Sequence, residues 1–165
     1  MIRNADKSDA DNIADIYNYY IENSVISFEE KTVSGADMRR RIESVQESGL
    51  PWVVAVEDDV VVGYAYATKW KERSAYRFSV EASVYLSYQK LGRGLGVRLY
   101  ETIFTSLQAV GVHTVIGGIA LPNPASVALH EKMGMTKVAH FEKVGFKFQQ
   151  WHDVGYWQRH LTTDE

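Results

Sequence analysis

The sequence predicts an α/β (α+β) fold in which about four helices flank a mixed, mostly antiparallel sheet of about seven strands. Segments with helical spacing of apolar residues alternate with β-rich segments throughout the 165 residues. A short acidic turn joins two β-rich segments, which favours an antiparallel hairpin. One long amphipathic helix separates two further β-rich segments, which favours a parallel pair of strands. Because the chain has no repeats and no linkers, we expect a single domain over residues 1–165.

Four segments combine helix start signals with apolar residues at helical spacing. Ser8 with Asp11, and Ser34 with Asp37, have the spacing of capping boxes. Asn123 supplies a further cap, followed directly by a proline, which is favoured in the first helical turn. The expected helices span about 9–22, about 35–46, from 92–96 to 111, and from 123 to about 133.

The β-rich segments between these helices are expected to form the sheet. In the segment 79–87 apolar side chains occupy the even positions, and Glu81, Ser83 and Tyr85 lie on the opposite face. This strand therefore carries a carboxylate near its middle. The expected strands span 52–57, 60–68, 79–87, 112–119, about 137–147 and 154–161, and residues 162–165 are expected to be a disordered tail.

Composition and charge exclude several classes of protein. The chain has 18 Lys and Arg against 21 Asp and Glu, a formal charge of −3, which argues against nucleic acid as a partner. It has no cysteine, which excludes disulfides, thiolate zinc sites and cysteine nucleophiles. Its five histidines lack metal-ligand spacing, so we expect no metal. Without a signal peptide or a membrane-spanning stretch, we expect a cytoplasmic protein that binds no membrane.

The run from Gln89 to Gly96, QKLGRGLG, is the strongest local signal for ligand binding. It follows a predicted strand and opens a helix, so its glycines and the helix N-terminus suit a phosphate group. It is not a Walker loop, because it lacks the Gly-Lys-Ser/Thr ending. It is not a dinucleotide fingerprint either, since the third glycine would fall at Val97 or Leu99. A plain glycine-rich turn remains the alternative.

Taken with the segments that follow it, this loop resembles the GNAT acetyltransferase superfamily. Asn123, Ser126 and LHEKMG at 129–134 stand about thirty residues after it, as in that family. Four more segments resemble the phosphinothricin and methionine sulfoximine N-acetyltransferase branch, and the similarity covers nearly the whole chain. They are WKERSAY at 70–76, EASVY at 81–85, LPNP at 121–124 and GFKFQQWHDVG at 145–155.

The resemblance implies acetyl-CoA as the co-substrate. The glycine loop would hold its pyrophosphate, and the strand at 84–86 would splay from the strand at 115–119 to admit the pantetheine arm. A bulge in the first strand would expose a backbone N–H to the thioester carbonyl. The residues expected to bind the cofactor are Val84, Tyr85, Leu86, Gly92, Arg93, Gly94, Leu95, Gly96, Val97, Asn123 and Ser126.

Two residues are expected to be catalytic. The resemblance places the general base at Glu81, where burial should raise the pKa of the carboxyl toward a useful range. His130 shares a helix face with Ser126, and would either protonate the departing thiolate or orient the substrate. The alternatives are a strand-edge glutamate facing solvent and a packed or solvated histidine. Without a cysteine for an acyl-enzyme, we expect direct transfer in a ternary complex.

The loop before the Glu81 strand indicates the class of substrate. Lys71, Arg73 and Tyr76 would suit the carboxylate of an amino acid, or the phosphinate, sulfone or sulfoximine group of an analogue. Phe28 would supply an apolar wall. A solvated basic loop is the simpler alternative. With the resemblance, this leads us to expect α-amine acetylation of a small amino acid or of an analogue such as phosphinothricin, methionine sulfoximine or methionine sulfone.

Other functions and partners stay open at this point. A GNAT enzyme could act instead on a polyamine, an aminoglycoside or a protein amine, or the chain could be a non-catalytic acetyl-CoA sensor. Related dimers lead us to expect a homodimer, with Phe146, Phe148 and Trp151 on the closing strands at the interface.

Overall fold

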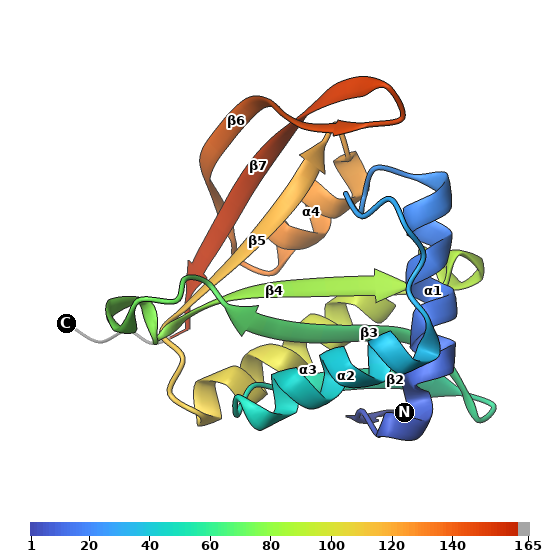
Figure 1. Cartoon of the computed structure of the whole chain (residues 1–165). Helices are drawn as coiled ribbons and strands as arrows, with labels where there is room; N and C mark the ends of the chain where they lie inside the picture. The colour runs from blue at the N-terminus through green and yellow to red at the C-terminus, as the bar shows by residue number, and fades with distance from the viewer. Residues whose placement is uncertain (162–165) are drawn as a thin grey trace.

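A seven-stranded sheet forms the centre of the computed structural model, which describes residues 1–161 (Figure 1). Its order is β1-β2-β3-β4-β5-β7-β6, and β4–β5 is its parallel pair. This confirms the predicted mixed, mostly antiparallel sheet, whereas the tail expected at 162–165 lies outside the described residues. The strands are β1 (Ile2–Asn4), β2 (Trp52–Glu57), β3 (Val60–Lys69), β4 (Ser79–Leu86), β5 (Thr114–Leu121), β6 (Thr136–Lys147) and β7 (Gln150–His160).

Helices cover both faces of this sheet (Figure 1). One core cluster joins α1 and α2 to one face, and the other joins α3 and the end of α4 to the opposite face. In β2, Trp52 and Val54 belong to the first cluster while Val53 and Ala55 belong to the second, so this strand is buried on both sides. The helices are α1 (Ala10–Asn23), α2 (Gly35–Glu47), α3 (Leu95–Ala109) and α4 (Pro124–Lys132).

The parallel strands β4 and β5 separate along their length. Pairing covers only Ser79–Glu81 of β4 against 114–116 of β5, and Figure 1 shows the two strands diverging beyond that point. The expected splay is therefore present. The expected bulge is not, because β4 pairs with β3 without a register shift from Val80 to Leu86. Loss of the β5 partner, rather than a bulge, leaves backbone groups on one edge of β4 without a strand partner.

The start of the chain differs from the prediction. The capping box is formed by Asp6 and Asp9 of the 3₁₀ turn before α1, not by Ser8 and Asp11. Asp9 then precedes α1 without making a side-chain cap, because its carboxylate accepts from Arg3 and from the amide of Asp6. The short edge strand β1 also went unpredicted, since three residues show no periodicity, and β7 begins four residues earlier than expected.

The caps predicted for α2 and α4 are confirmed, although the box at Ser34 lacks its second half because the Asp37 carboxylate accepts from Arg40. The Ser34 hydroxyl accepts from the amide of Asp37 at 3.0 Å, and the Asn123 side chain accepts from the amide of Ser126 at 3.2 Å. None of the helices within 1–161 is long and apolar enough to cross a membrane. The same part of the chain contains no cluster of three or more His, Asp or Glu that could hold a metal ion.

Candidate active site

Three adjoining cavities meet where β4 and β5 separate. The Glu81 pocket, about 620 Å³, lies on the side of β4 that carries Glu81. The glycine-loop cleft, about 390 Å³, runs along the loop before α3. A junction chamber of about 60 Å³ shares Tyr85 and Ile26 with both. Because they share lining residues, the three cavities adjoin one another, and we refer to them together as the channel.

Backbone geometry builds the glycine-loop cleft. Gly92 and Gly94 have φ of 73° and 75°, in the left-handed region that favours glycine. Gly94 directly precedes α3, so the first amide groups of that helix face the loop and suit an anion. Ten of the residues expected to bind cofactor line this cleft: Val84, Tyr85, Leu86, Gly92, Gly94, Leu95, Gly96, Val97, Asn123 and Ser126.

Two residues of the cleft differ from expectation. Arg93 is absent from the lining, because its guanidinium lies 3.2 Å from the carboxylate of Glu57, which Lys90 also approaches at 3.4 Å. Tyr20 of α1, which was not predicted to bind the cofactor, lines the cleft. Its hydroxyl donates to the carbonyl oxygen of Leu86. A single tyrosine in an amphipathic helix carries no signal that distinguishes a binding role from packing.

The cleft fits the acetyl-CoA that the resemblance implies. The helix N-terminus at Gly94 offers amide donors at one end for a pyrophosphate. Apolar side chains, among them Val84, Leu86 and Leu129, line the middle. The partnerless edge of β4 runs beside them and can pair with the amides of a pantetheine arm.

Glu81 projects from β4 into the pocket named after it, together with Ser83 and Tyr85, as the alternation predicts. Burial raises the pKa of the Glu81 carboxyl, and the nearby positive charge of Lys71 opposes this shift. A Cβ at Gly118 on β5 would lie 3.0 Å from Tyr156 Cε1 and 3.5 Å from Glu81 Oε2, so glycine leaves room chiefly for the ring of Tyr156. A half-buried carboxyl with a raised pKa is suited to accept a proton near neutral pH.

His130 is buried in α4 and lines the junction chamber. Its Nδ1 lies 2.7 Å from the carbonyl oxygen of Ser126, which can only accept, so Nδ1 carries the hydrogen. Nε2 then accepts from the hydroxyl of Tyr100 at 2.8 Å. Burial lowers the pKa of His130, which favours the neutral ring. Sequence reasoning missed Tyr100, which lies within the apolar stripe of α3 and reads there as a core residue.

The predicted substrate residues lie in two places. Phe28 lines the Glu81 pocket, as expected. Lys71 is close enough to lower the pKa of Glu81, and its ammonium lies over the ring of Trp70, 4.9 Å from the ring centre. Arg73 and Tyr76 lie on the exposed turn before β4 and, like Lys71, are not among the lining residues.

Side chains from distant segments complete the Glu81 pocket. The connector between α1 and α2, residues 24–34, supplies a continuous stretch of its wall, and β6 and β7 supply the opposite side. Sequence reasoning did not identify these residues, because each lies in an unremarkable apolar or polar setting in the sequence. The additional lining residues are Tyr17, Ile26, Ser27, Glu29, Tyr66, Ala120, Phe141, Val144, Val154 and Tyr156.

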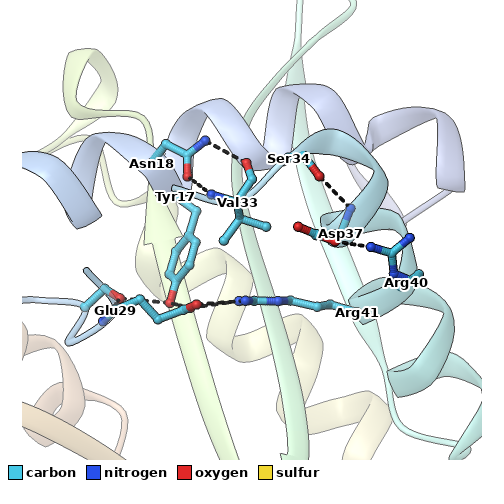
Figure 2. Close-up of polar contacts among 9 residues, drawn as sticks. Tyr17, Asn18, Glu29, Val33, Ser34, Asp37, Arg40 and Arg41 are labelled. Atoms are coloured by element: carbon cyan, nitrogen blue, oxygen red, sulfur yellow. Dashed lines mark hydrogen bonds and ion pairs between the residues drawn. The ribbon is translucent and has the colours of Figure 1, made fainter. Parts of the chain in front are cut away.

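The α1–α2 connector is fixed by polar contacts to α1 and α2 (Figure 2). Arg41 of α2 donates to both oxygens of Glu29, at 2.8 and 2.7 Å, and the hydroxyl of Tyr17 donates to the same carboxylate. This arrangement holds the pKa of Glu29 below its usual range. Asn18 bonds both backbone groups of Val33, at 2.9 and 2.8 Å. The pocket wall therefore has defined anchors on both helices.

Comparison with known proteins agrees with this geometry. The acetyltransferase (GNAT) domain family matches residues 2–155. Phosphinothricin N-acetyltransferase of Streptomyces viridochromogenes is 40% identical over 158 residues, covering 96% of this chain and 86% of the relative. L-Methionine sulfoximine/L-methionine sulfone acetyltransferase of Salmonella typhimurium is 34% identical over 160 residues, covering 97% and 94%.

A solved structure shares both the fold and the sequence. A Salmonella typhimurium acetyltransferase, solved with its cofactor acetyl-CoA, superimposes with a TM-score of 0.96 at 34% identity, covering 99% of this chain and 95% of that one. The agreement extends over the whole sheet, including the splayed strands, and the sequence similarity is equally extensive. This chain therefore belongs to the GNAT N-acetyltransferases and, within them, to the phosphinothricin and methionine sulfoximine acetyltransferase branch.

Proposed function

We propose that this enzyme acetylates the α-amino group of a small amino acid or amino-acid analogue, taking the acetyl group directly from acetyl-CoA. The observation that carries the proposal is the junction chamber, which connects the carboxylate pocket of Glu81 to the cleft of the glycine loop. Phosphinothricin, methionine sulfoximine and methionine sulfone, the substrates in the relatives' names, are the first acceptors to test.

The residues of the channel can be assigned to the steps of acyl transfer. Acetyl-CoA, when bound, supplies the thioester carbonyl that the amine attacks. Glu81 takes a proton from the acceptor's ammonium group, because only the free amine is a nucleophile. Backbone N–H groups on the free edge of β4, beyond Glu81, stabilise the negative charge that develops on the carbonyl oxygen. The chain has no cysteine to form an acyl-enzyme, which favours direct attack.

His130 and Tyr100 are the groups we assign to the departing sulfur. As the amide forms and the carbon–sulfur bond breaks, the thiolate must gain a proton. The Tyr100 hydroxyl and the His130 ring both line the junction chamber and are hydrogen-bonded to each other. Because burial lowers the pKa of His130, its ring is neutral and its Nε2 only accepts, so the Tyr100 hydroxyl is the donor of the pair. The proton that the sulfur gains is the one that the attacking nitrogen loses as the amide forms, and the Tyr100 hydroxyl holds the sulfur by a hydrogen bond.

Charge at the pocket mouth supports an acceptor that carries an acidic group. Lys71 acts electrostatically on Glu81, and Arg73 lies two residues further along the same loop. An acceptor with a carboxylate and a phosphinate or sulfone group gains from such donors, whereas a polyamine or aminoglycoside is repelled by them. Phe28 supplies an apolar surface for the methylene groups of the acceptor.

We also propose that the enzyme is a homodimer that associates through the β6–β7 hairpin. Phe146, Phe148 and Trp151 on this hairpin are 53%, 53% and 60% exposed. Large apolar side chains gathered on one exposed element indicate a protein interface. Sedimentation should give a dimer for the native protein and a monomer for Trp151→Glu; a native monomer would contradict the proposal.

Release of free thiol from acetyl-CoA, measured across a panel of amines, tests the proposed reaction. The panel contains amino acids, phosphinothricin, methionine sulfoximine, methionine sulfone, polyamines and aminoglycosides. Saturable turnover on the acidic analogues is expected, and the double variant Lys71→Glu with Arg73→Glu should lose it. Turnover on cationic amines alone would overturn the acceptor class. Acetyl-CoA binding without thiol release would indicate a sensor instead of an enzyme acting on these amines.

A further inference from the structure

One end of β6 forms a docking face for the α1–α2 connector. Among the 12 residues of β6, Gly145 and Lys147 are the buried ones. They are two positions apart and so share a face of the strand, while Phe146 between them is exposed. The residues that cover this face are Ser24, Ser27 and Phe28 of the connector.

Lys147 holds the backbone of the connector. Its ammonium donates to the carbonyl oxygens of Ser24 and Ser27, at 2.8 and 2.7 Å, across 123 and 120 positions of sequence. The side chain is only 2% exposed, and burial lowers the pKa of its ammonium. Burying a cation is costly, and an aliphatic residue would fill the same space without that cost. The contacts that distinguish lysine from such a residue are those of its ammonium to the two carbonyl oxygens and to the ring of Phe148, 5.0 Å from the ring centre.

Gly145 determines where the ring of Phe28 lies. A Cβ on Gly145 would stand 2.2 Å from Phe28 Cε2, so the ring packs directly on the backbone of β6. From there Phe28 lines the Glu81 pocket. Any larger residue at position 145 must displace the ring and change the shape of the pocket.

The connector also has hydrogen-bonded anchors on both sides of Phe28. The hydroxyl of Tyr17 is hydrogen-bonded to Ser27 Oγ at 2.8 Å and also donates to the carboxylate of Glu29. Arg41 donates to both oxygens of that carboxylate (Figure 2). Phe28 is therefore flanked by two anchored residues. Its position is set by contacts to α1, α2 and β6. Within the connector, Ile26 is the residue that also lines the glycine-loop cleft.

We propose that Lys147 is a positioning residue: it fixes the connector that carries Phe28 and so positions the acceptor amine. Gly145, by setting the position of the Phe28 ring, determines which acceptor side chains the pocket admits. The inference rests on the proposed function, since it assigns the Glu81 pocket to the acceptor. Lys147 does not itself line that pocket and acts through Phe28. Its loss should therefore change recognition of the acceptor more than recognition of acetyl-CoA, which the connector meets at Ile26.

Steady-state kinetics of three variants test the role of Lys147. Lys147→Met removes the charge but keeps an unbranched side chain, Lys147→Arg keeps a cation, and Lys31→Met is the matched control on an exposed lysine of the same connector. Because small misplacements of a positioned substrate are costly, Lys147→Met should raise the acceptor KM about tenfold to a hundredfold. The KM for acetyl-CoA should change much less, Lys147→Arg should recover part of the loss, and the control should match the native enzyme. Equal changes in both KM values, or none, would overturn the proposal.

Hydrogen exchange provides a second test that needs no substrate. In the protein without acetyl-CoA or acceptor, Lys147→Met should speed hydrogen exchange of the amides within 24–29 and leave the exchange of the β4 amides unchanged. No change in either region, or an equal change in both, would overturn the proposal that Lys147 holds the connector. If the native enzyme acetylates no amino acid, the proposed function fails while this measurement still decides whether Lys147 holds the connector. Should Lys147→Met not fold, Lys147→Arg is compared in the same two regions.

Gly145→Ala tests separately whether Gly145 determines which acceptor side chains the pocket admits, because Lys147 is retained in this variant. The added methyl group must displace Phe28, so the ratio of kcat/KM between methionine sulfone and a smaller amino acid should change from that of the native enzyme. An unchanged ratio would show that Gly145 does not set the acceptor side chain. A native KM for acetyl-CoA confirms that the variant is folded.

Discussion

The two ends of the channel are built in different ways. The glycine-loop cleft is built around one loop, from the edge of β4, the glycines before α3 and the first turns of α3 and α4, with Tyr20 and Ile26 added from α1 and the connector. The Glu81 pocket is formed by side chains from α1, the connector, β3, β4, β6 and β7. The first depends on a few backbone angles, such as φ of 75° at Gly94. The second depends on contacts between segments far apart in the sequence, such as Lys147 with Ser24.

This difference shows how one fold can keep its donor and vary its acceptor. A cleft made of amide groups and glycines is insensitive to most side-chain substitutions, provided that the backbone angles are kept. A pocket made of side chains changes shape with each substitution in its wall. The contrast predicts that substitutions divide into those that affect acetyl-CoA, those that affect the acceptor, and those at the junction that affect only the chemical step.

Glu81→Gln should have the largest effect and should mark the boundary between the two ends. The amide cannot accept the ammonium proton, so kcat should fall about 10²- to 10⁴-fold. Both KM values should stay near those of the native enzyme, because neither binding surface changes. The native kcat should rise with pH as Glu81 ionises, at a midpoint above the usual glutamate pKa because burial raises the pKa of this carboxyl. Native pH dependence in the variant would rule out Glu81 as the base.

The same substitution should affect stability in the opposite direction. Because burial raises the pKa of Glu81 in the folded state, its protonated form favours folding. That contribution is complete below the unfolded-state pKa and is lost as pH rises through the folded-state pKa. Thermal unfolding should therefore show Glu81→Gln more stable than the native enzyme at neutral pH, with the difference disappearing in acid. A less stable variant at neutral pH would indicate an unrecognised partner of the carboxylate.

The same contrast explains what could be predicted from the sequence. Ten of the eleven residues expected to bind the cofactor line the glycine-loop cleft, because most of them lie on a strand, a loop and a helix that are consecutive in the chain. Tyr20 and Ile26, which line it from elsewhere in the chain, were not predicted. The face of β4 with Glu81 followed from simple alternation. Pocket walls such as Ile26 and Val144 could not be predicted, since they meet only when the connector packs on β6. Arg73 is close to Glu81 in sequence, but its turn extends outward from the pocket.

Tyr100→Phe should sharpen the assignment of the junction. Removing the hydroxyl leaves Nε2 of His130 buried without its donor, and we expect kcat to fall about tenfold, the value of one buried hydrogen bond. Neither KM should change if the pair acts on the departing sulfur. A higher acceptor KM with unchanged kcat would instead mean that His130 orients the substrate. Stopped-flow measurement of thiol release in a single turnover separates the two outcomes.

Gly94→Ala should affect the cofactor end alone. A residue with a Cβ is strained by about 1–2 kcal/mol in the left-handed region, so the KM for acetyl-CoA should rise about tenfold as the loop shifts to relieve it. The acceptor KM should not change. Gly49→Ala is the matched control, since Gly49 has φ of 83°, with nothing within 4 Å of its Cβ position, in the turn after α2. Gly49→Ala should lower the melting temperature without changing either KM. A change in the acceptor KM of Gly94→Ala would contradict the division between the two ends of the channel.

Arg93→Ala should have the smallest effect, because this side chain is exposed and paired with Glu57. Its charge can attract the pyrophosphate only through solvent, so the KM for acetyl-CoA should rise about two- to threefold at low salt and return to the native value at high salt. Glu57→Gln frees the same guanidinium and should lower that KM under the same low-salt conditions. Opposite, salt-sensitive shifts in the two variants would mean that Arg93 contributes a diffuse field while the backbone holds the phosphates. A salt-independent loss of tenfold or more, about the value of a direct charged hydrogen bond, would mean instead that Arg93 turns into the cleft when acetyl-CoA binds.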